Sequence, residues 1–407
     1  MKLVFFVMEF PVPSETFVMN QITYFIDHGY DVNIIAVFPG DFINTHKDFV
    51  NYKLASKTTF LLPRENKNKI LKVVMRSLIV ASNFYKYLVR DALSSRQFGI
   101  HSKNLILPSI MALNNKKIDA DYFLVHFGFS GVLANKLRKL GLFNGKIATI
   151  FHGADISRAD VLSLYHDDYI RLFDDTEILL PVSYLWRNKL ITLGCKPDKI
   201  RVIRMGINPK NFKLKKIRAP GLKLKILTIA RLEDKKGINI AIEACAILKA
   251  RGVQFSYEVI GSGVLMSNLQ EQIDKLHLKN DVKLLGFKAQ EDIMAYLNEA
   301  DLFLLPSRTA ENGDMEGIPV ALMESMAVGT PVISTYHSGI PELIEDKVTG
   351  WLAPENNAIC IANIIEKIVK SGDSNSLIIT NAREKIEKEF NQLESYASLE
   401  RVLNEFM

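Results

Sequence analysis

The sequence is poor in cysteine and has no long apolar run. Its three cysteines, Cys195, Cys245 and Cys360, stand far apart, and no two have metal-ligand spacing. This excludes a disulfide scaffold and favours a reducing compartment. No segment approaches the ~18 consecutive apolar residues of a membrane-spanning helix. The apolar run at the N-terminus ends at Glu9 without a small-residue cleavage site, so it predicts a buried first strand and a cytoplasmic protein rather than a signal peptide.

Glycine and proline are also too few, at 22 and 14 in 407 residues, for a collagen-like or disordered chain. The composition is 48% hydrophobic and 24% charged, which is typical of a soluble globular protein. Domains mostly contain ~100–200 residues, so this length predicts two of them.

The net charge of +6 is unevenly distributed. Residues 1–205 hold 27 basic and 18 acidic side chains, and residues 47–103 alone hold 12 basic and 3 acidic ones. A basic surface suits nucleic acid, but no RNP-like motif, zinc-finger spacing or helix-turn-helix signal accompanies it, so we expect no nucleic-acid partner. An anionic membrane surface and a diphosphate-bearing acceptor both fit this surplus.

Short apolar runs alternate with helical patterns twice along the chain. This alternation is typical of parallel sheets that helices cover on both faces. We therefore predict an α/β protein with two Rossmann-like, doubly wound domains that face a cleft. The predicted strands are Leu3–Val7, Val32–Val37, Tyr122–Val125, Ile147–Phe151 and Ile178–Leu180, then Lys225–Ala230, Phe255–Ile260, Val282–Leu285, Leu302–Leu305 and Val332–Ser334.

A lysine-rich stretch with two prolines, residues 208–223, breaks both patterns and predicts the linker. The predicted domains are therefore residues 1–207 and residues 208–385. Residues 386–407 predict a charged C-terminal helix that crosses back to the first domain.

Residues 66–90 combine basic side chains with an apolar stripe. Helical spacing aligns Ile70, Val74, Leu78 and Ala81, and it places Lys69, Lys72 and Arg76 beside them. Lys67, another basic residue of this segment, lies just before the apolar stripe. A core-packed helix with a solvated basic edge and a helix lying on a membrane surface both fit it.

The most informative motif is residues 314–324. Pro319 suits the start of a helix, where its missing N–H is not needed, and the free amides of such a first turn bind phosphate. Glu316 precedes the predicted helix, and Glu324 lies about two turns further on. Two carboxylates flanking a helix N-terminus match a nucleotide-sugar, which has hydroxyls on both sides of its diphosphate. Taken alone, Glu324 also fits a solvated helix residue.

Loops after other predicted strands add polar and glycine residues. Arg231 and Lys236 follow one strand and suit a leaving diphosphate, although this loop taken alone fits a charged surface turn better. Gly261 and Gly263 follow another strand and allow a ligand to approach the backbone. Met266 stands where the dinucleotide fingerprint has its third glycine.

Two histidines end predicted strands of the first half. His152 and His126 could each bond the backbone at a strand end or reach a bound sugar. The Asp167-Asp168 and Asp174-Asp175 pairs are interpreted as solvated helix or turn faces, so no metal-binding DxD motif is assigned.

Taken together, these motifs resemble the family-four retaining glycosyltransferases of the GT-B fold, and in particular bacterial colanic acid and exopolysaccharide transferases. The resemblance runs from the first strand to about Phe390. It is carried by the E-x7-E pair Glu316/Glu324 and by residues 13–17, 149–153, 230–232 and 313–326. One departure is the segment Glu9–Thr16, where many members of the family have glycines.

The resemblance implies that residues 1–207 bind the acceptor and that residues 208–385 bind the nucleotide-sugar. It also implies a role for each matching residue. His152, Glu316, Arg231 and Lys236 are the implied catalytic residues, with Arg231 and Lys236 on the diphosphate and Glu316 on the transferred sugar. The implied substrate-binding residues are Glu324 on the ribose, Phe287 beside the base, and Gly261, Gly263, Gly317, Ile318, Pro319, Val320, Glu15 and His126.

The resemblance also implies the reaction. A hexose moves from a nucleotide-diphosphate sugar, with UDP-hexose ahead of GDP-mannose, to a lipid diphosphate-linked glycan for capsule, exopolysaccharide or O-antigen. The anomeric configuration is retained, and no metal or other cofactor is expected. Such a protein is peripheral at the inner face of the cytoplasmic membrane.

Three alternatives stay open at this point. A nicotinamide-dependent oxidoreductase lacks a full G-x-G-x-x-G here. A non-catalytic sugar-nucleotide binding protein would keep the diphosphate residues but would not turn the donor over. A GT-B sugar-nucleotide epimerase needs acid–base carboxylates instead of a diphosphate clamp.

Overall fold

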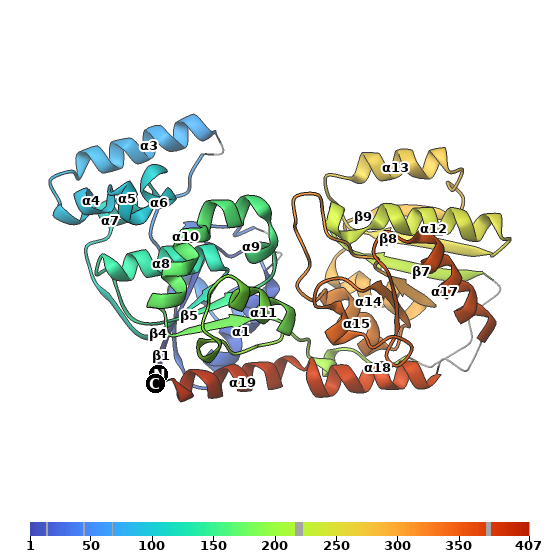
Figure 1. Ribbon diagram of the computed structural model, residues 1–407. Coiled ribbons are helices and arrows are strands. Elements are labelled where there is room, and N and C mark those ends of the chain that lie inside the picture. The colour runs from blue at the N-terminus through green and yellow to red at the C-terminus, as the bar shows by residue number, and fades with distance from the viewer. Residues whose placement is uncertain (14, 44, 67, 216–222, 372–375, 407) are drawn as a thin grey trace.

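The computed structural model contains two six-stranded sheets, one in each half of the chain (Figure 1). It describes residues 1–13, 15–43, 45–66, 68–215, 223–371 and 376–406. Ser14, Lys67, part of the predicted linker, and the chain's last residue lie outside the described residues. The prediction of two doubly wound α/β domains is confirmed.

The first sheet has the strand order β3-β2-β1-β4-β5-β6, and all its neighbouring strands are parallel. Its central strands are buried on both faces because helices cover both, which explains their continuous apolar runs. The strands are β1 (Lys2–Phe10), β2 (Asp31–Pro39), β3 (Thr58–Phe60), β4 (Ile118–His126), β5 (Phe143–Phe151) and β6 (Ile178–Pro181).

The helices of this half surround the sheet, and several of them form a separate layer. In Figure 1 this layer, α3 to α7, stands off the sheet, and α3 is its outermost helix. The helices are α1 (Thr16–Asp27), α2 (Lys47–Asn51), α3 (Lys69–Ser82), α4 (Tyr87–Ala92), α5 (Ser95–Phe98), α6 (Ile100–Lys103), α7 (Ile106–Leu113), α8 (Gly128–Lys139), α9 (Ala154–Ser157), α10 (Ala159–Asp175) and α11 (Tyr184–Thr192).

The second sheet repeats the arrangement with the order β12-β11-β10-β7-β8-β9, again parallel throughout. Its strands are β7 (Leu224–Ile229), β8 (Phe255–Ile260), β9 (Val282–Gly286), β10 (Leu302–Leu304), β11 (Val332–Thr335) and β12 (Trp351–Ala353). Its helices are α12 (Ile238–Ala250), α13 (Met266–Lys275), α14 (Gln290–Glu299), α15 (Val320–Val328), α16 (Ile340–Leu343), α17 (Ala358–Ser371) and α18 (Ser376–Glu389).

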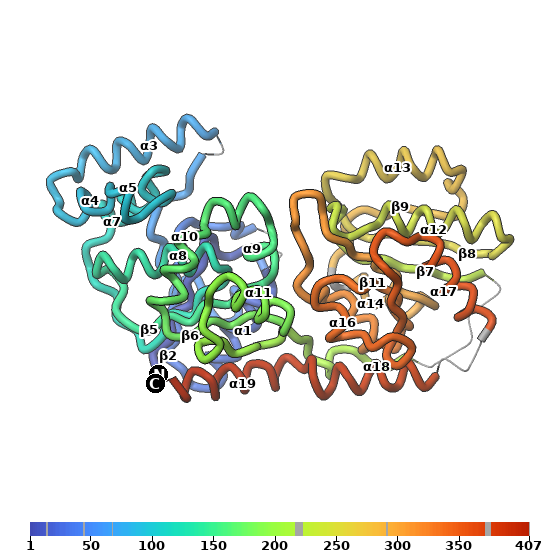
Figure 2. Tube along the Cα trace, in the orientation of Figure 1, coloured from blue at the N-terminus to red at the C-terminus, as the bar shows by residue number. Residues whose placement is uncertain are grey.

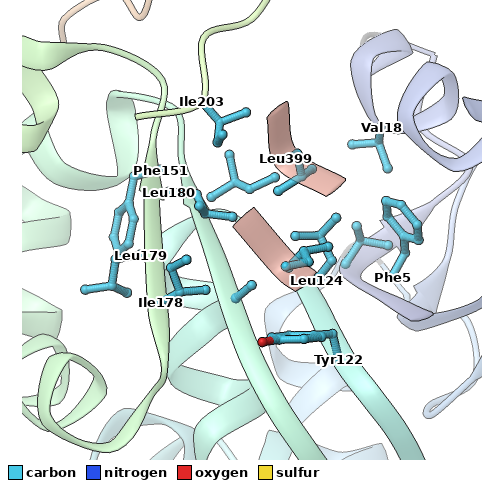
Figure 3. Packing of buried hydrophobic residues seen from close by; sticks show 14 of the residues in the cluster. Phe5, Val18, Tyr122, Leu124, Phe151, Ile178, Leu179, Leu180, Ile203 and Leu399 are labelled. Carbon is cyan, nitrogen blue, oxygen red and sulfur yellow. The ribbon is translucent and has the colours of Figure 1, made fainter. Parts of the chain in front are cut away.

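Each sheet carries one apolar cluster on each face. Figure 3 shows part of one cluster of the first sheet, in which Phe5 of β1, Leu124 of β4 and Leu180 of β6 meet. The next residue along β1, Phe6, belongs to the cluster on the opposite face, as the alternation of side chains in a strand requires.

The last helix, α19 (Gln392–Glu405), packs against the first half. Figure 2 shows the chain running from α18, beside the second sheet, into α19 along α1. Leu399 and Leu403 are fully buried in the first half's core, and the Tyr30 hydroxyl donates to Glu400 Oε1 at 2.5 Å. No helix within the described ranges is long and apolar enough to cross a membrane.

Candidate functional site

Two histidines meet at the carboxyl edge of the first sheet. His126 ends β4 and His152 directly follows β5, and these strands are neighbours. Nδ1 of His126 lies 3.1 Å from Nε2 of His152, and Nε2 of His126 lies 3.1 Å from Oε1 of Gln21 on α1. His126 is only 1% exposed and both its ring nitrogens have protein partners, so it has no nitrogen left for a ligand here. Burial lowers the pKa of His152 to about 3, which keeps its imidazole neutral.

Asp155, which the sequence analysis did not single out, holds the turn around His152. Its carboxylate accepts hydrogen bonds from the backbone N–H groups of Gly128 (2.8 Å), His152 (3.1 Å) and Gly153 (2.8 Å). Burial raises the pKa of Asp155 to about 6, although these backbone hydrogen bonds oppose the shift. No local sequence pattern indicated this role, because the backbone N–H groups that Asp155 accepts from precede it in the chain, and that of Gly128 lies far from it in sequence.

The carboxyl edge of the second sheet carries a buried ion pair. Glu316 Oε1 lies 2.7 Å from Nζ of Lys236, and the two side chains are 8% and 12% exposed. The backbone N–H of Glu316 donates to Nε2 of His337, and Ser338 donates to the Glu316 carbonyl. Burial acts to raise the pKa of Glu316, but attraction to Lys236 and Lys235 and the hydrogen bond from Lys236 outweigh it and lower the pKa. The carboxylate is therefore ionised.

His337 links this pair to a second carboxylate. Its ring is fully buried, and its Nδ1 lies 2.5 Å from Glu355 Oε1 while its Nε2 accepts from the Glu316 N–H. An acceptor at Nε2 requires the ring proton to be at Nδ1 in the neutral form, where it faces the carboxylate. His337 thus positions the backbone of Glu316 from the neighbouring strand-end loop.

The other charged residues of the strand-end loops differ in burial. The Arg231 side chain is 64% exposed and lies 2.9 Å from Glu233, so it can turn toward a ligand. Lys235 is buried and pairs with Asp314 at 3.1 Å. The structure thus brings both predicted cations to this edge, the exposed Arg231 and the largely buried Lys236.

Two glycines let the neighbouring loops approach each other closely. A Cβ on Gly261, whose φ is +143°, would lie 1.8 Å from the Ala230 carbonyl oxygen, and a Cβ on Gly263 would lie 2.5 Å from that of Leu232. These glycines are therefore needed for backbone packing, whatever a ligand requires of them. Phe287, just after β9, is 79% exposed.

Helix α15 begins directly after Pro319, as the proline suggested. Pro319 is the N-cap, and the helix runs from Val320 to Val328. Glu324 is therefore the fifth helical residue, just over one turn in, and not about two turns in as the sequence analysis expected. Ile318 is buried and Val320 is 39% exposed.

The two edges touch each other at this site. A Cβ on Gly153 would lie 3.1 Å from the Glu316 carbonyl oxygen, and one on Gly317 would lie 2.6 Å from that of His152. The Met315 N–H donates to Ser157 Oγ, also at 3.1 Å. The fold therefore brings His152, Glu316, Gly317 and Lys236 together, although they come from opposite halves of the chain.

Glu15 lies at the same edge of the first sheet, as the N-cap of α1. Its pKa is raised to about 7, mainly by burial and further by the charge of Glu9. Phe17, the second residue of α1, packs against His152 with ring centroids 4.7 Å apart. The start of α1 thus carries a carboxyl group with a raised pKa and an aromatic ring that packs on His152.

One acidic and one basic side chain are buried, although the sequence predicted that both would face solvent. Asp168, interpreted as solvated, is buried and pairs with Lys136 at 2.6 Å. Arg76, interpreted as a surface charge, is buried and pairs with Glu65 at 2.6 Å. In both cases a distant partner compensates the charge, and periodicity alone does not reveal such a partner. Within the described ranges, no three His, Cys, Asp or Glu side chains gather as a metal-ligand set.

Comparison with known proteins gives matches over the whole chain. Residues 209–385 match the family described as "Glycosyl transferases group 1". The chain is 52% identical over 403 residues to the amylovoran biosynthesis glycosyltransferase AmsK of Erwinia amylovora, covering 99% of each chain. It is 45% identical to the colanic acid biosynthesis glycosyltransferase WcaL of Escherichia coli (strain K12), covering 96% of this chain and 97% of that one.

Solved structures share the architecture of both halves. The structure of Anabaena Alr3699/HepE in complex with UDP aligns with a TM-score of 0.73 and 17% identity, covering 100% of each chain. At this identity the likeness is one of fold.

Proposed function

The chain belongs to the glycosyl transferases group 1 family, and on that premise we propose that it transfers a hexose with retention of anomeric configuration. The donor is a UDP-hexose, with glucose or galactose ahead of the mannose of GDP-mannose. The acceptor is a growing glycan on a lipid diphosphate, made for an exopolysaccharide, capsule or O-antigen. The names of the two similar proteins, which belong to amylovoran and colanic acid biosynthesis, support this class of product.

The buried pair Glu316–Lys236 carries the proposal. It lies just before the N-terminus of α15, whose first amides have no partner within the helix and favour an anion. In the proposal, Glu316 holds hydroxyls of the transferred hexose, Lys236 and Arg231 contact the diphosphate, and Glu324 bonds the ribose. Gly261, Gly263 and Phe287 line the nucleoside side, and the amides of Gly317, Ile318 and Val320 complete the phosphate site after Pro319.

The reaction needs no nucleophile from the protein. The bond from the sugar C1 to the diphosphate oxygen breaks, the acceptor hydroxyl oxygen bonds C1 from the same face, and the hydroxyl proton passes to the diphosphate. Positioning and charge stabilisation supply the acceleration. His152 reaches the hexose from the first half, and Glu15 lies on the acceptor side. We propose that Arg231, Lys236 and the helix amides stabilise the negative charge on the leaving diphosphate without a metal, so a chelator leaves the rate unchanged.

The first experiment identifies the donor and tests the contact between Arg231 and the diphosphate. UDP-, GDP- and ADP-sugars are screened for thermal stabilisation and slow hydrolysis. The loss of a charge-assisted contact costs ~1.5–3 kcal/mol, so Arg231→Ala should lower kcat/KM at least tenfold. The matched control is Arg251→Ala, since Arg251 also forms a surface ion pair in the same half, with Glu366 at 3.1 Å. Equal rates in the two variants, or no response to any nucleotide-sugar, would contradict the proposal.

The outer helix α3 supports the membrane part of the proposal. Its stripe faces solvent: Ile70 is 73% exposed and Leu78 is 65% exposed, while Arg76 and Val80 are its buried residues. The helix thus turns apolar side chains outward and an arginine inward, the reverse of a core-packed surface helix. Large exposed apolar patches of this kind mark interaction surfaces. The neighbouring exposed apolar side chains are Leu71, Val73, Val74, Phe84, Tyr85, Tyr87 and Leu88.

Basic side chains around this patch select an anionic bilayer as its partner. Lys69, Arg64 and Arg90 are exposed close to it in sequence, and Lys72 is partly exposed. Each basic residue near such a surface contributes about 1 kcal/mol, and each inserted apolar group adds to that. We propose that α3 lies in the lipid interface, at the side where a lipid-linked acceptor arrives.

Vesicle flotation tests this attachment. Wild type should float with vesicles of anionic phospholipid, less at high salt and less with neutral lipid. Leu78→Asp should abolish flotation, because it puts a charge in the apolar stripe. The matched control is Leu377→Asp on α18, since Leu377 is 67% exposed but far from this patch in the chain. If both variants float like wild type, α3 is not the attachment surface.

A further inference from the structure

Three side chains from three elements form a hydrogen-bonded chain beneath the site. Gln21 comes from α1, His126 from the end of β4, and His152 from the residue after β5. The two links, Gln21 Oε1 to His126 Nε2 and His126 Nδ1 to His152 Nε2, are both 3.1 Å long. Gln21 and His126 are 3% and 1% exposed, so solvent does not compete for these bonds. Neither residue can contact a substrate directly.

The position of each proton follows from this chain. An amide oxygen only accepts hydrogen bonds, and a neutral imidazole carries one N–H. Because Oε1 of Gln21 faces Nε2 of His126, that nitrogen carries the proton, and Nδ1 of His126 is left as an acceptor. His152 must then donate from its own Nε2. The proton of His152 is thereby fixed on Nε2, and its Nδ1 carries a lone pair.

Packing fixes the plane of the His152 ring as well. Phe17 and Phe127 flank it, with ring centroids 4.7 Å and 4.6 Å from that of the imidazole. Phe127 has a φ of +71°, which is rare for a bulky residue and is held only where the surroundings require it. Burial lowers the pKa of both histidines, so the neutral forms that this proton arrangement needs are the populated ones.

We infer that Gln21 and His126 are positioning residues that hold His152 in a single tautomer, with Nδ1 as a hydrogen-bond acceptor for a hydroxyl of the bound sugar. The sugar contact rests on the proposed function, whereas the tautomer does not. A strand-end histidine that could otherwise donate or accept thus becomes an acceptor only. The specificity consequence is that a donor sugar must offer a hydroxyl at that point.

The test replaces Gln21, whose buried Oε1 accepts from Nε2 of His126. Gln21→Met keeps the length of the side chain but removes its oxygen, so His126 can exchange between tautomers and His152 with it. The ¹⁵N shifts of the histidine side chains, assigned with His152→Gln, should change from a single-tautomer pattern to an averaged one. With the donor found by the screen, kcat should fall about five- to tenfold while KM stays within about twofold.

A conservative variant and a matched control separate positioning from folding. Gln21→Glu keeps an acceptor oxygen in place, so it should preserve the wild-type ¹⁵N pattern of His152. Gln272→Met is the control, because Gln272 is also a helix glutamine whose side-chain amide is hydrogen-bonded, here as a donor to the Asn239 carbonyl at 3.0 Å, but it lies in the other half. Melting temperatures of all variants are compared with wild type.

An unchanged His152 pattern in Gln21→Met, or a Gln21→Glu variant that loses the pattern as fully as Gln21→Met does, would overturn the inference. If no nucleotide-sugar is turned over, the proposed function fails, and the ¹⁵N pattern still decides whether Gln21 and His126 set the tautomer.

Discussion

Removing Lys236 should destabilise the second half of the protein, because it leaves the Glu316 carboxylate buried without its partner. The two charged atoms are 2.7 Å apart, and the side chains are 12% and 8% exposed. Breaking such a pair from one side costs about 3–5 kcal/mol. Each kcal/mol shifts the melting temperature of a unit of 150–250 residues by ~2–4 °C, so Lys236→Met should lower it by roughly 10 °C.

The size of this effect should depend on pH in a defined direction. Lys236 and Lys235 lower the pKa of Glu316 below its ordinary 4.5, so the pair stabilises the folded state above that pH and the contribution is lost as the pH falls through the lowered pKa. Without Lys236 the burial that raises the pKa is opposed less, and the carboxyl group takes up a proton more readily. The difference between wild type and Lys236→Met should therefore be largest near pH 7 and shrink toward pH 4.

A double-mutant cycle isolates the pair. Thermal unfolding followed by circular dichroism is measured for Lys236→Met, Glu316→Gln and the double variant at both pH values. The double variant should be more stable than Lys236→Met, because no charge remains unpaired. Additive losses, or a Lys236→Met variant as stable as wild type at pH 7, would refute the reasoning.

Three further predictions concern neighbouring residues. Burial raises the pKa of Glu15 to about 7, so its ionisation lowers the free energy of unfolding as the pH rises from 4.5 to 7. Glu15→Gln should therefore stabilise the protein at pH 8 and have no effect at pH 4, as measured by denaturant unfolding. Gly153→Ala should lower transfer at least tenfold, because its φ of +123° is strained for alanine and the new Cβ would lie 3.1 Å from the Glu316 carbonyl oxygen; normal kcat would show that the two edges separate during turnover. Calorimetry with UDP should show lost affinity in Glu324→Ala and nearly unchanged affinity in Glu316→Ala, and equal losses would count against separate ribose and sugar roles.

The sheets could be predicted from the sequence because buried parallel strands are continuous apolar runs. The interior strands all appear as runs such as Phe255–Ile260, which matches β8 in full. The sequence analysis missed β3 (Thr58–Phe60) and β12 (Trp351–Ala353), which have three residues each and lie at sheet edges. So short a segment has no measurable period, and its pairing depends on a neighbour distant in the chain.

Pairwise contacts between distant residues could not be predicted. The helical spacing of apolar residues predicted the apolar stripe of α3. Whether such a stripe faces solvent or the core depends on the helices that pack beneath it. Arg76 is buried because Glu65 and the Asn104 carbonyl bind it there. His152, Glu316 and Lys236 could be singled out because they follow predicted strands in recognisable motifs, while Asp155 and Gln21 act through contacts that no local pattern indicates.

The return of the chain from α18 into α19 determines the order in which the halves can be completed during synthesis. The first half consists of two pieces, because Leu399 and Leu403 of α19 belong to its core. The whole second half, residues 224–389, leaves the ribosome between those pieces. At 5–20 residues per second, the apolar surface of α1 remains uncovered for roughly 10–40 seconds after residue 205 has been made. The half that is begun first is therefore finished last, and until then part of its apolar core has no cover.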